Sequence, residues 1–137
     1  MVVADAGLLS NTNIQMLIDN RYAFILGARI KNEGKILQQQ ILANTYKNGS
    51  SKVFIKNDGT KLIVSYSDSR ATKDALNRER GIKRLEKQIK QGKLSKSNIN
   101  NKGYNKYLKL DGQINVSIDY DKYKADACWD GLKGYIT

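Results

Sequence analysis

Two apolar runs, separated by a segment long enough for one short helix, constrain the fold more than any other feature. The first spans residues 2–4 and the second residues 22–30, and both are rich in β-branched or aromatic side chains. Runs of this kind are typical of strands buried on both faces of a sheet. Between them lies an apolar stripe at helical spacing with a polar N-cap candidate before it: Ile14, Leu17 and Ile18, preceded by Ser10 or Asn11. The order strand, helix, strand predicts a parallel, right-handed unit.

The pattern changes near residue 50. Residues 52–56 and 61–66 are β-rich runs joined through Asp58-Gly59, which predicts an antiparallel hairpin. An amphipathic helix is expected before it, over residues 33–44, and further strands over 107–119 and 132–137. We therefore expect an α/β (α+β) chain in which a parallel part precedes an antiparallel part.

The residue types that are missing restrict the chemistry. The chain has no histidine and one cysteine, Cys128, which excludes Ser-His-Asp and Cys-His catalytic groups, imidazole zinc sites and an internal disulfide. No apolar run reaches the ~20 residues that cross a bilayer, and no signal-peptide pattern is present, so we expect no membrane partner. The single cysteine fits a reducing cytosol, and we expect a cytoplasmic, bacterial location with association to the nucleoid when active. Catalysis would have to rely on carboxylates or hydroxyls with a hard metal ion.

The formal charge of +11, from 24 basic and 13 acidic residues, indicates a polyanionic partner. From Arg70 to Lys109 the chain carries thirteen Lys or Arg against three acids, within and after a predicted long basic helix at about 70–92. This imbalance favours a DNA-facing surface that contacts phosphates, whereas the alternative is a solvated helix face with i,i+4 ion pairs. The candidate DNA-binding residues on this helix are Arg70, Lys73, Arg78, Arg80, Arg84 and Lys87. Tyr104 and Tyr107 offer either stacking on an unpaired base or ordinary packing.

Asp5 is the leading candidate for a functional carboxylate. It follows the first predicted strand, and Gly7 lets the backbone turn away immediately afterwards. Arg29 and Lys31 end the second strand, and the carboxyl ends of parallel strands meet at one edge of a sheet, where α/β proteins place their sites. These residues predict a phosphate site beside a metal site. The alternatives are that Asp5 is an ordinary turn or capping residue and that Arg29 pairs with Glu33.

Three segments resemble DDE transposases, specifically the insertion-sequence enzymes of the IS four-like superfamily. They are residues 2–10, around the position of the second catalytic aspartate, residues 22–31, and the terminal residues 130–137. The segments occur in the family's order and span nearly the whole chain.

The resemblance implies a partial ribonuclease H-like core over residues 1–44, a β-rich insertion over 45–130 and a return strand over 131–137. It implies that Asp5 is one of three carboxylates that hold two Mg²⁺ ions for DNA strand cleavage and transfer. The implied partners are transposon ends and target DNA, with a possible homodimer of the intact parent enzyme.

The chain also departs from the family pattern. The first aspartate would belong to an earlier strand, and the glutamate to a helix following Thr137. Glu86 is not a substitute, because Lys93 has the expected separation from it but position 82 holds Ile instead of Arg and no tyrosine precedes it. We therefore expect an interior fragment that is inactive by itself and does not bind Mg²⁺ tightly. The alternatives are a non-catalytic basic nucleic-acid-binding module and a structural remnant.

Overall fold

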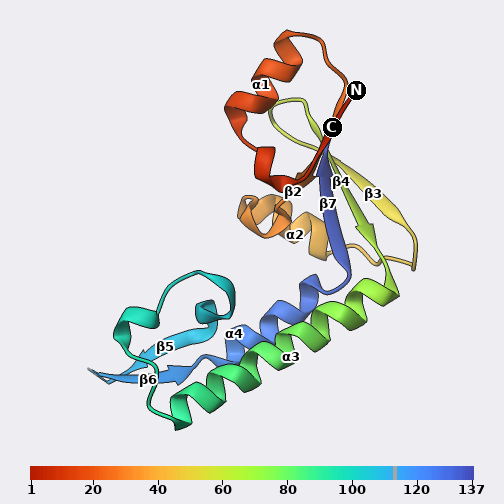
Figure 1. Cartoon of the computed structure of the whole chain (residues 1–137). Helices are drawn as coiled ribbons and strands as arrows, with labels where there is room; N and C mark the ends of the chain where they lie inside the picture. The colour runs from red at the N-terminus through yellow and green to blue at the C-terminus, as the bar shows by residue number, and fades with distance from the viewer. Residues whose placement is uncertain (113) are drawn as a thin grey trace. The chain divides into compact units, whose positions relative to one another are not determined.

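The computed structural model describes residues 1–112 and 114–137 (Figure 1). The chain forms two compact units, Met1–Arg70 together with Gly131–Thr137, and Ala71–Asp130. We call the first the sheet unit and the second the helix-hairpin unit.

The sheet unit is built on a five-stranded mixed sheet. Its strand order is β1-β2-β7-β4-β3, with bounds Val2–Ala4, Phe24–Ala28, Leu132–Ile136, Lys61–Tyr66 and Ser51–Ile55. The β1–β2 pair is parallel and the other three pairs are antiparallel. Figure 1 shows β7, the last strand of the chain, among strands from its first half. The predicted mixed α/β class and the parallel first pair are thus confirmed.

Two helices accompany the sheet. α1 (Asn11–Asp19) connects β1 to β2 and begins at Ser10, whose side chain accepts a hydrogen bond from the backbone N–H of Asn13. α2 (Lys35–Leu42) follows β2. Ile14 and Leu17 of α1 and Ile41 of α2 are buried, but Ile18, the third residue of the predicted α1 stripe, is 41% exposed. No helix in residues 1–112 or 114–137 is long and apolar enough to cross a membrane.

The sheet has one buried face and one open face. Side chains alternate between faces along a strand, and paired residues on neighbouring strands share a face. Leu26, Leu62, Val64 and Ile136 fill the buried face, each at most 1% exposed. The open face carries apolar side chains on all five strands: Val3, Ile25, Tyr135, Ile63 and Val53, with Gly27 as the β2 partner of Tyr135. Val3 is 72% exposed and Val53 59%.

β1 is therefore not the doubly buried strand that its sequence predicts. It lies at one edge of the sheet, with β2 as its neighbour, and its side chains are only partly buried or exposed. The apolar side chains of Val2, Val3 and Ala4 suit a strand that is covered on both faces. The described residues cover only one face of β1.

The helix-hairpin unit consists of most of α3 (Asp68–Lys90), the hairpin β5 (Leu108–Asp111) and β6 (Asn115–Ile118), and α4 (Tyr120–Ala125). Three 3₁₀ turns complete it: η3 (Lys96–Asn98), η4 (Gly103–Tyr107) and η5 (Asp126–Trp129). Its core contains Ile82 and Leu85 of α3 with Tyr107, Leu108 and Ile118. The long basic helix thus forms close to its predicted position.

The boundary between the units differs from the predicted division at residues 44 and 45. The hairpin of β3 and β4 pairs through β4 with β7 and joins the same sheet as β1 and β2. The sheet unit therefore continues to Arg70, and the segment that forms a separate unit is Ala71–Asp130. A hairpin pattern identifies two paired strands but not the strand that β4 pairs with on its other side.

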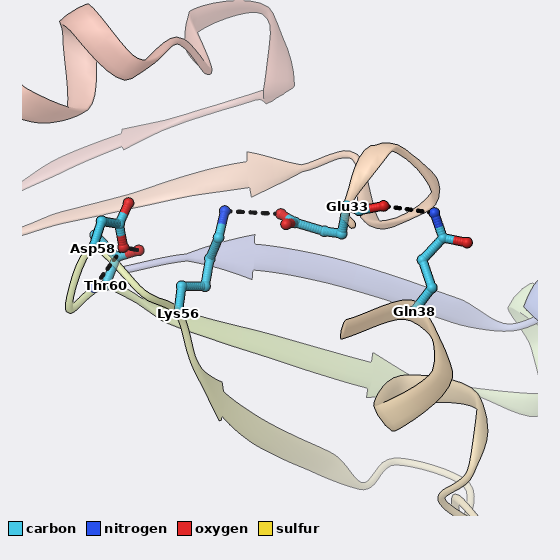
Figure 2. A network of polar contacts seen from close by, with 5 residues as sticks. All are labelled: Glu33, Gln38, Lys56, Asp58 and Thr60. Atoms are coloured by element: carbon cyan, nitrogen blue, oxygen red, sulfur yellow. Dashed lines mark hydrogen bonds and ion pairs between the residues drawn. The ribbon is translucent and has the colours of Figure 1, made fainter. Parts of the chain in front are cut away.

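The turn between β3 and β4 is held by the carboxylate of Asp58 (Figure 2). Asp58 Oδ1 accepts hydrogen bonds from the Thr60 hydroxyl at 2.5 Å and from the Thr60 backbone N–H at 2.9 Å. The hydroxyl bond is the main reason that the pKa of Asp58 lies below its ordinary value, followed by the backbone bond. Thr60 is itself buried.

We expect Thr60→Val to reduce the acid sensitivity of the sheet unit. A lowered pKa means that the charged carboxylate stabilises the fold above the ordinary aspartate pKa, and that this contribution disappears as pH falls through the folded-state pKa. The measurement is the free energy of unfolding in urea at pH 5 and at pH 2.5. The difference between the two pH values should be smaller in Thr60→Val than in the wild type. An unchanged difference would mean that the hydroxyl does not set the Asp58 pKa.

Candidate functional site

Asp5 lies directly after β1, at the carboxyl end of the parallel strand pair. Its backbone is extended, and its Oδ1 accepts a hydrogen bond of 2.8 Å from the backbone N–H of Gly7, which caps the 3₁₀ turn Ala6–Leu8 (η1). The residue is exposed. The capping alternative is therefore realised, but it occupies one carboxylate oxygen and leaves the residue accessible to a ligand.

Gly27 of β2 allows β1 to approach closely at this position. A Cβ atom on Gly27 would stand 2.9 Å from the backbone nitrogen of Ala6 and 3.3 Å from the carbonyl carbon of Asp5. Real Cβ atoms do not come this near to backbone atoms, so any other residue would displace the peptide that follows Asp5. The absence of a side chain at residue 27 thus allows the peptide that follows Asp5 to lie this close to β2.

Arg29 and Lys31 lie where the sequence predicts, just beyond the end of β2. Arg29 precedes the 3₁₀ turn Ile30–Asn32 (η2), which contains Lys31, and both residues are exposed. Because β1 and β2 are parallel, Arg29, Lys31 and Asp5 all lie at the carboxyl ends of these two strands, on one edge of the sheet.

The proposed pairing of Arg29 with Glu33 does not form. The Glu33 carboxylate instead forms an ion pair of 2.9 Å with Lys56 Nζ. The Gln38 side chain donates a hydrogen bond of 2.6 Å to the backbone carbonyl of Glu33 (Figure 2). Within residues 1–112 and 114–137, Arg29 has no ion pair and remains available for an anion.

A carboxylate oxygen suits a hard cation such as Mg²⁺, but Asp5 supplies only one such group. In the described part of the chain, no three side chains of the types His, Cys, Asp and Glu gather into a possible metal site. The described residues thus offer Asp5 as a single potential ligand and form no complete metal site.

The basic residues of α3 fall into two classes. Exposed cations recur on the helix face opposite Ile82 and Leu85, at Lys73, Arg80, Arg84 and Lys87, with Arg70 one turn earlier. We call these five residues the α3 stripe. They are the predicted DNA-binding residues of this helix with the exception of Arg78.

Arg78 instead has a structural role in the helix-hairpin unit. Its guanidinium forms a two-bond ion pair with the Asp130 carboxylate and lies 5.6 Å from the centre of the Tyr123 ring. The hydrogen bond with Asp130 raises the pKa of Arg78 above its ordinary value. Position 78 belongs to the same helical stripe as residues 82, 85 and 89, which is the sequence signal that it faces the core.

Tyr104 and Tyr107 pack within the protein, which supports the packing alternative. The Tyr104 ring lies so close to Gly81 that a Cβ there would be 2.5 Å from its nearest ring atoms. Tyr107 is 2% exposed, and its hydroxyl donates to Asp126 Oδ2 at 2.8 Å. Burial and this hydrogen bond both raise the pKa of Tyr107 above its ordinary value. Neither ring is placed to stack on a base.

Sequence reasoning missed a groove that is contained in the helix-hairpin unit. It has a volume of about 660 Å³ and lies between α3 and β6. Its lining includes Lys83, Lys87 and Lys90. A row of lysines at helical spacing is visible in the sequence, but the β6 wall is not.

Comparisons with protein-family models, with curated proteins and with solved structures found no match to this chain.

Proposed function

We propose that this chain is the central part of the catalytic core of a DDE transposase, cytoplasmic and acting on DNA in the intact parent. Asp5 would be one of the three carboxylates that hold two Mg²⁺ ions, and the chain alone would neither cut nor join DNA. The observation that carries the proposal is the exposed Asp5 at the carboxyl edge of a parallel strand pair, with Arg29 at the same edge. Two-metal phosphoryl transfer requires carboxylates for the metals and benefits from cations beside the phosphate.

The topology of the chain supports a ribonuclease H-like core interrupted by an insertion. The chain leaves the sheet after β4, forms the helix-hairpin unit, and returns as β7 beside β2. The open, apolar face of the sheet and the exposed edge strand β1 are also consistent with a larger core, because parallel strands are normally covered on both faces.

The basic surface supports a DNA partner. The five residues of the α3 stripe are exposed, and none has an ion pair among residues 1–112 and 114–137. Such an array of cations along a helix attracts phosphates without reading base sequence. We expect DNA affinity to fall steeply as salt rises, because each phosphate contact releases bound counterions.

Asp5→Asn is expected to abolish a weak Mn²⁺ site. With Mn²⁺ as a paramagnetic substitute for Mg²⁺, amide NMR signals of Asp5–Gly7 and of residues 27–29 should broaden at millimolar metal in the wild type. The same signals should stay sharp in Asp5→Asn, which keeps the shape of the side chain and loses its charge. Equal broadening in both proteins would place the metal elsewhere and overturn the role of Asp5. Asp19→Asn, which changes an exposed acid on α1, is the matched control and should leave the broadening unchanged.

A non-catalytic nucleic-acid-binding module is the second candidate. It is favoured by the location of most of the α3 stripe in a different unit from Asp5. Salt-sensitive DNA binding without any Mn²⁺ effect at Asp5 would select this candidate. Cleavage of DNA by the purified chain with Mg²⁺, lost in Asp5→Asn, would contradict the proposal that the chain is inactive by itself.

A further inference from the structure

The groove between α3 and β6 combines a basic wall with an apolar floor. Lys83, Lys87 and Lys90 follow one another at i, i+4 and i+7 and therefore line one side of α3. Ile89, Val116 and Ile118 contribute apolar surface, and Tyr120 stands at the margin with 45% of its surface exposed. All of these residues belong to the helix-hairpin unit.

The charge in the groove is predominantly positive. Lys83 pairs with Glu79 at 3.0 Å, but this pair is largely exposed and so contributes little. Lys87 and Lys90 have no acid partner within residues 1–112 and 114–137. The one acid of the lining, Glu86, accepts a hydrogen bond of 3.0 Å from the Tyr120 hydroxyl.

This combination is suited to an unpaired strand better than to a duplex. Lysines follow a phosphate backbone in either form of DNA, but apolar and aromatic groove surface gains energy only from base faces, which are stacked inside a duplex and accessible in a single strand. The α3 stripe, by contrast, offers exposed cations alone.

We propose that the α3–β6 groove binds single-stranded DNA, with phosphates on Lys83, Lys87 and Lys90 and a base against Tyr120 and the apolar floor. This inference rests on the proposed function, since it assigns a DNA form to part of the DNA-binding surface. It distinguishes two surfaces on one helix, which share Lys87: the stripe for phosphates of any DNA and the groove for unpaired strands.

Two charge-matched double variants test the assignment. Lys83→Gln/Lys90→Gln removes two cations from the groove, and Lys73→Gln/Arg80→Gln removes two from the stripe. The probes are an oligo-dT single strand and a mixed-sequence duplex of equal length, measured by fluorescence anisotropy at two salt concentrations. The groove variant should weaken oligo-dT binding about tenfold and duplex binding much less, whereas the stripe variant should weaken both by a similar factor.

Tyr120 provides a test that does not change the charge. Tyr120→Phe loses the bond to Glu86 and keeps the ring, and should retain most oligo-dT affinity. Tyr120→Leu loses the ring and should weaken oligo-dT binding about tenfold with the duplex unaffected. Circular dichroism spectra of each variant check that the unit is folded, and because Tyr120 is exposed, both should fold.

The outcomes separate the groove from the proposed function. Wild-type DNA binding with equal effects of both double variants on the two probes would overturn the groove assignment and leave the proposed function standing. A wild-type chain that binds neither probe would overturn both. The groove assignment is supported if the preference for oligo-dT over the duplex is lost in Lys83→Gln/Lys90→Gln and in Tyr120→Leu, and is kept in the stripe variant and in Tyr120→Phe.

Discussion

Gly131→Ala is expected to lower the free energy of unfolding of the sheet unit by about 3 kcal/mol. Gly131 has φ +82°, a conformation that disfavours any residue with a Cβ atom. A Cβ there would also stand 2.7 Å from Cδ2 of Tyr66 and 2.9 Å from the carbonyl oxygen of Ser67. Moving the backbone locally to relieve the strain would disturb the hydrogen bond of 3.2 Å that the Gly131 carbonyl accepts from the Ser67 N–H.

Gly59→Ala is the matched control for this prediction. Gly59 has φ +84° in the β3–β4 turn, and nothing lies within 4 Å of the position of its missing Cβ. It should therefore show only the conformational cost, about 1 kcal/mol. The measurement is urea unfolding followed by circular dichroism. Equal losses in the two variants would show that the space beside Gly131 can expand to accept a methyl group.

Arg78→Met is expected to lower the free energy of unfolding of the helix-hairpin unit by about 2–3 kcal/mol. The side chains of Arg78 and Asp130 are only 14% and 18% exposed, so the variant leaves a carboxylate with little access to water. Arg78 Nε has no hydrogen-bond partner in the described part of the chain, which already makes this charge expensive to bury. Lys83→Met, at an exposed ion pair on the same helix, should leave the free energy of unfolding nearly unchanged.

A double-mutant cycle separates the pair from the packing of the two side chains. Arg78→Met combined with Asp130→Leu should recover much of the stability lost by either single variant, because no unpaired charge remains buried. The measurement is again urea unfolding followed by circular dichroism. Additive losses in the double variant would mean that the two side chains contribute through packing and not through their charges.

The sequence predicts most elements of this fold but not all of their neighbours. The apolar runs, the helical stripes and the Asp58-Gly59 turn each depend on local spacing, and the elements form where the spacing places them. The edge position of β1 and the shared sheet of β4 and β7 depend on pairing between distant segments. Apolar side chains show only that a strand can be covered, and not what covers it.

The candidate site also has a part that the sequence predicts and a part that it does not. Asp5, Arg29 and Lys31 reach one edge of the sheet because parallel pairing follows from the order of elements. The sequence does not reveal that Glu33 pairs with Lys56, because that partner comes from the β3–β4 hairpin. The helical stripe indicates that Arg78 faces the core, but it does not reveal that the partner is Asp130, 52 positions later.

The way the chain leaves and re-enters the sheet has a consequence for its evolution and engineering. Tyr66, the last residue of β4, is the register partner of Leu132, the first residue of β7. The two strands are therefore paired like those of a hairpin, but the helix-hairpin unit takes the place of the connecting turn. The entropy cost of joining two such adjacent strand ends rises only slowly with the length of the connecting segment. The helix-hairpin unit can thus be lengthened, shortened or replaced while β4 and β7 keep their register in the sheet.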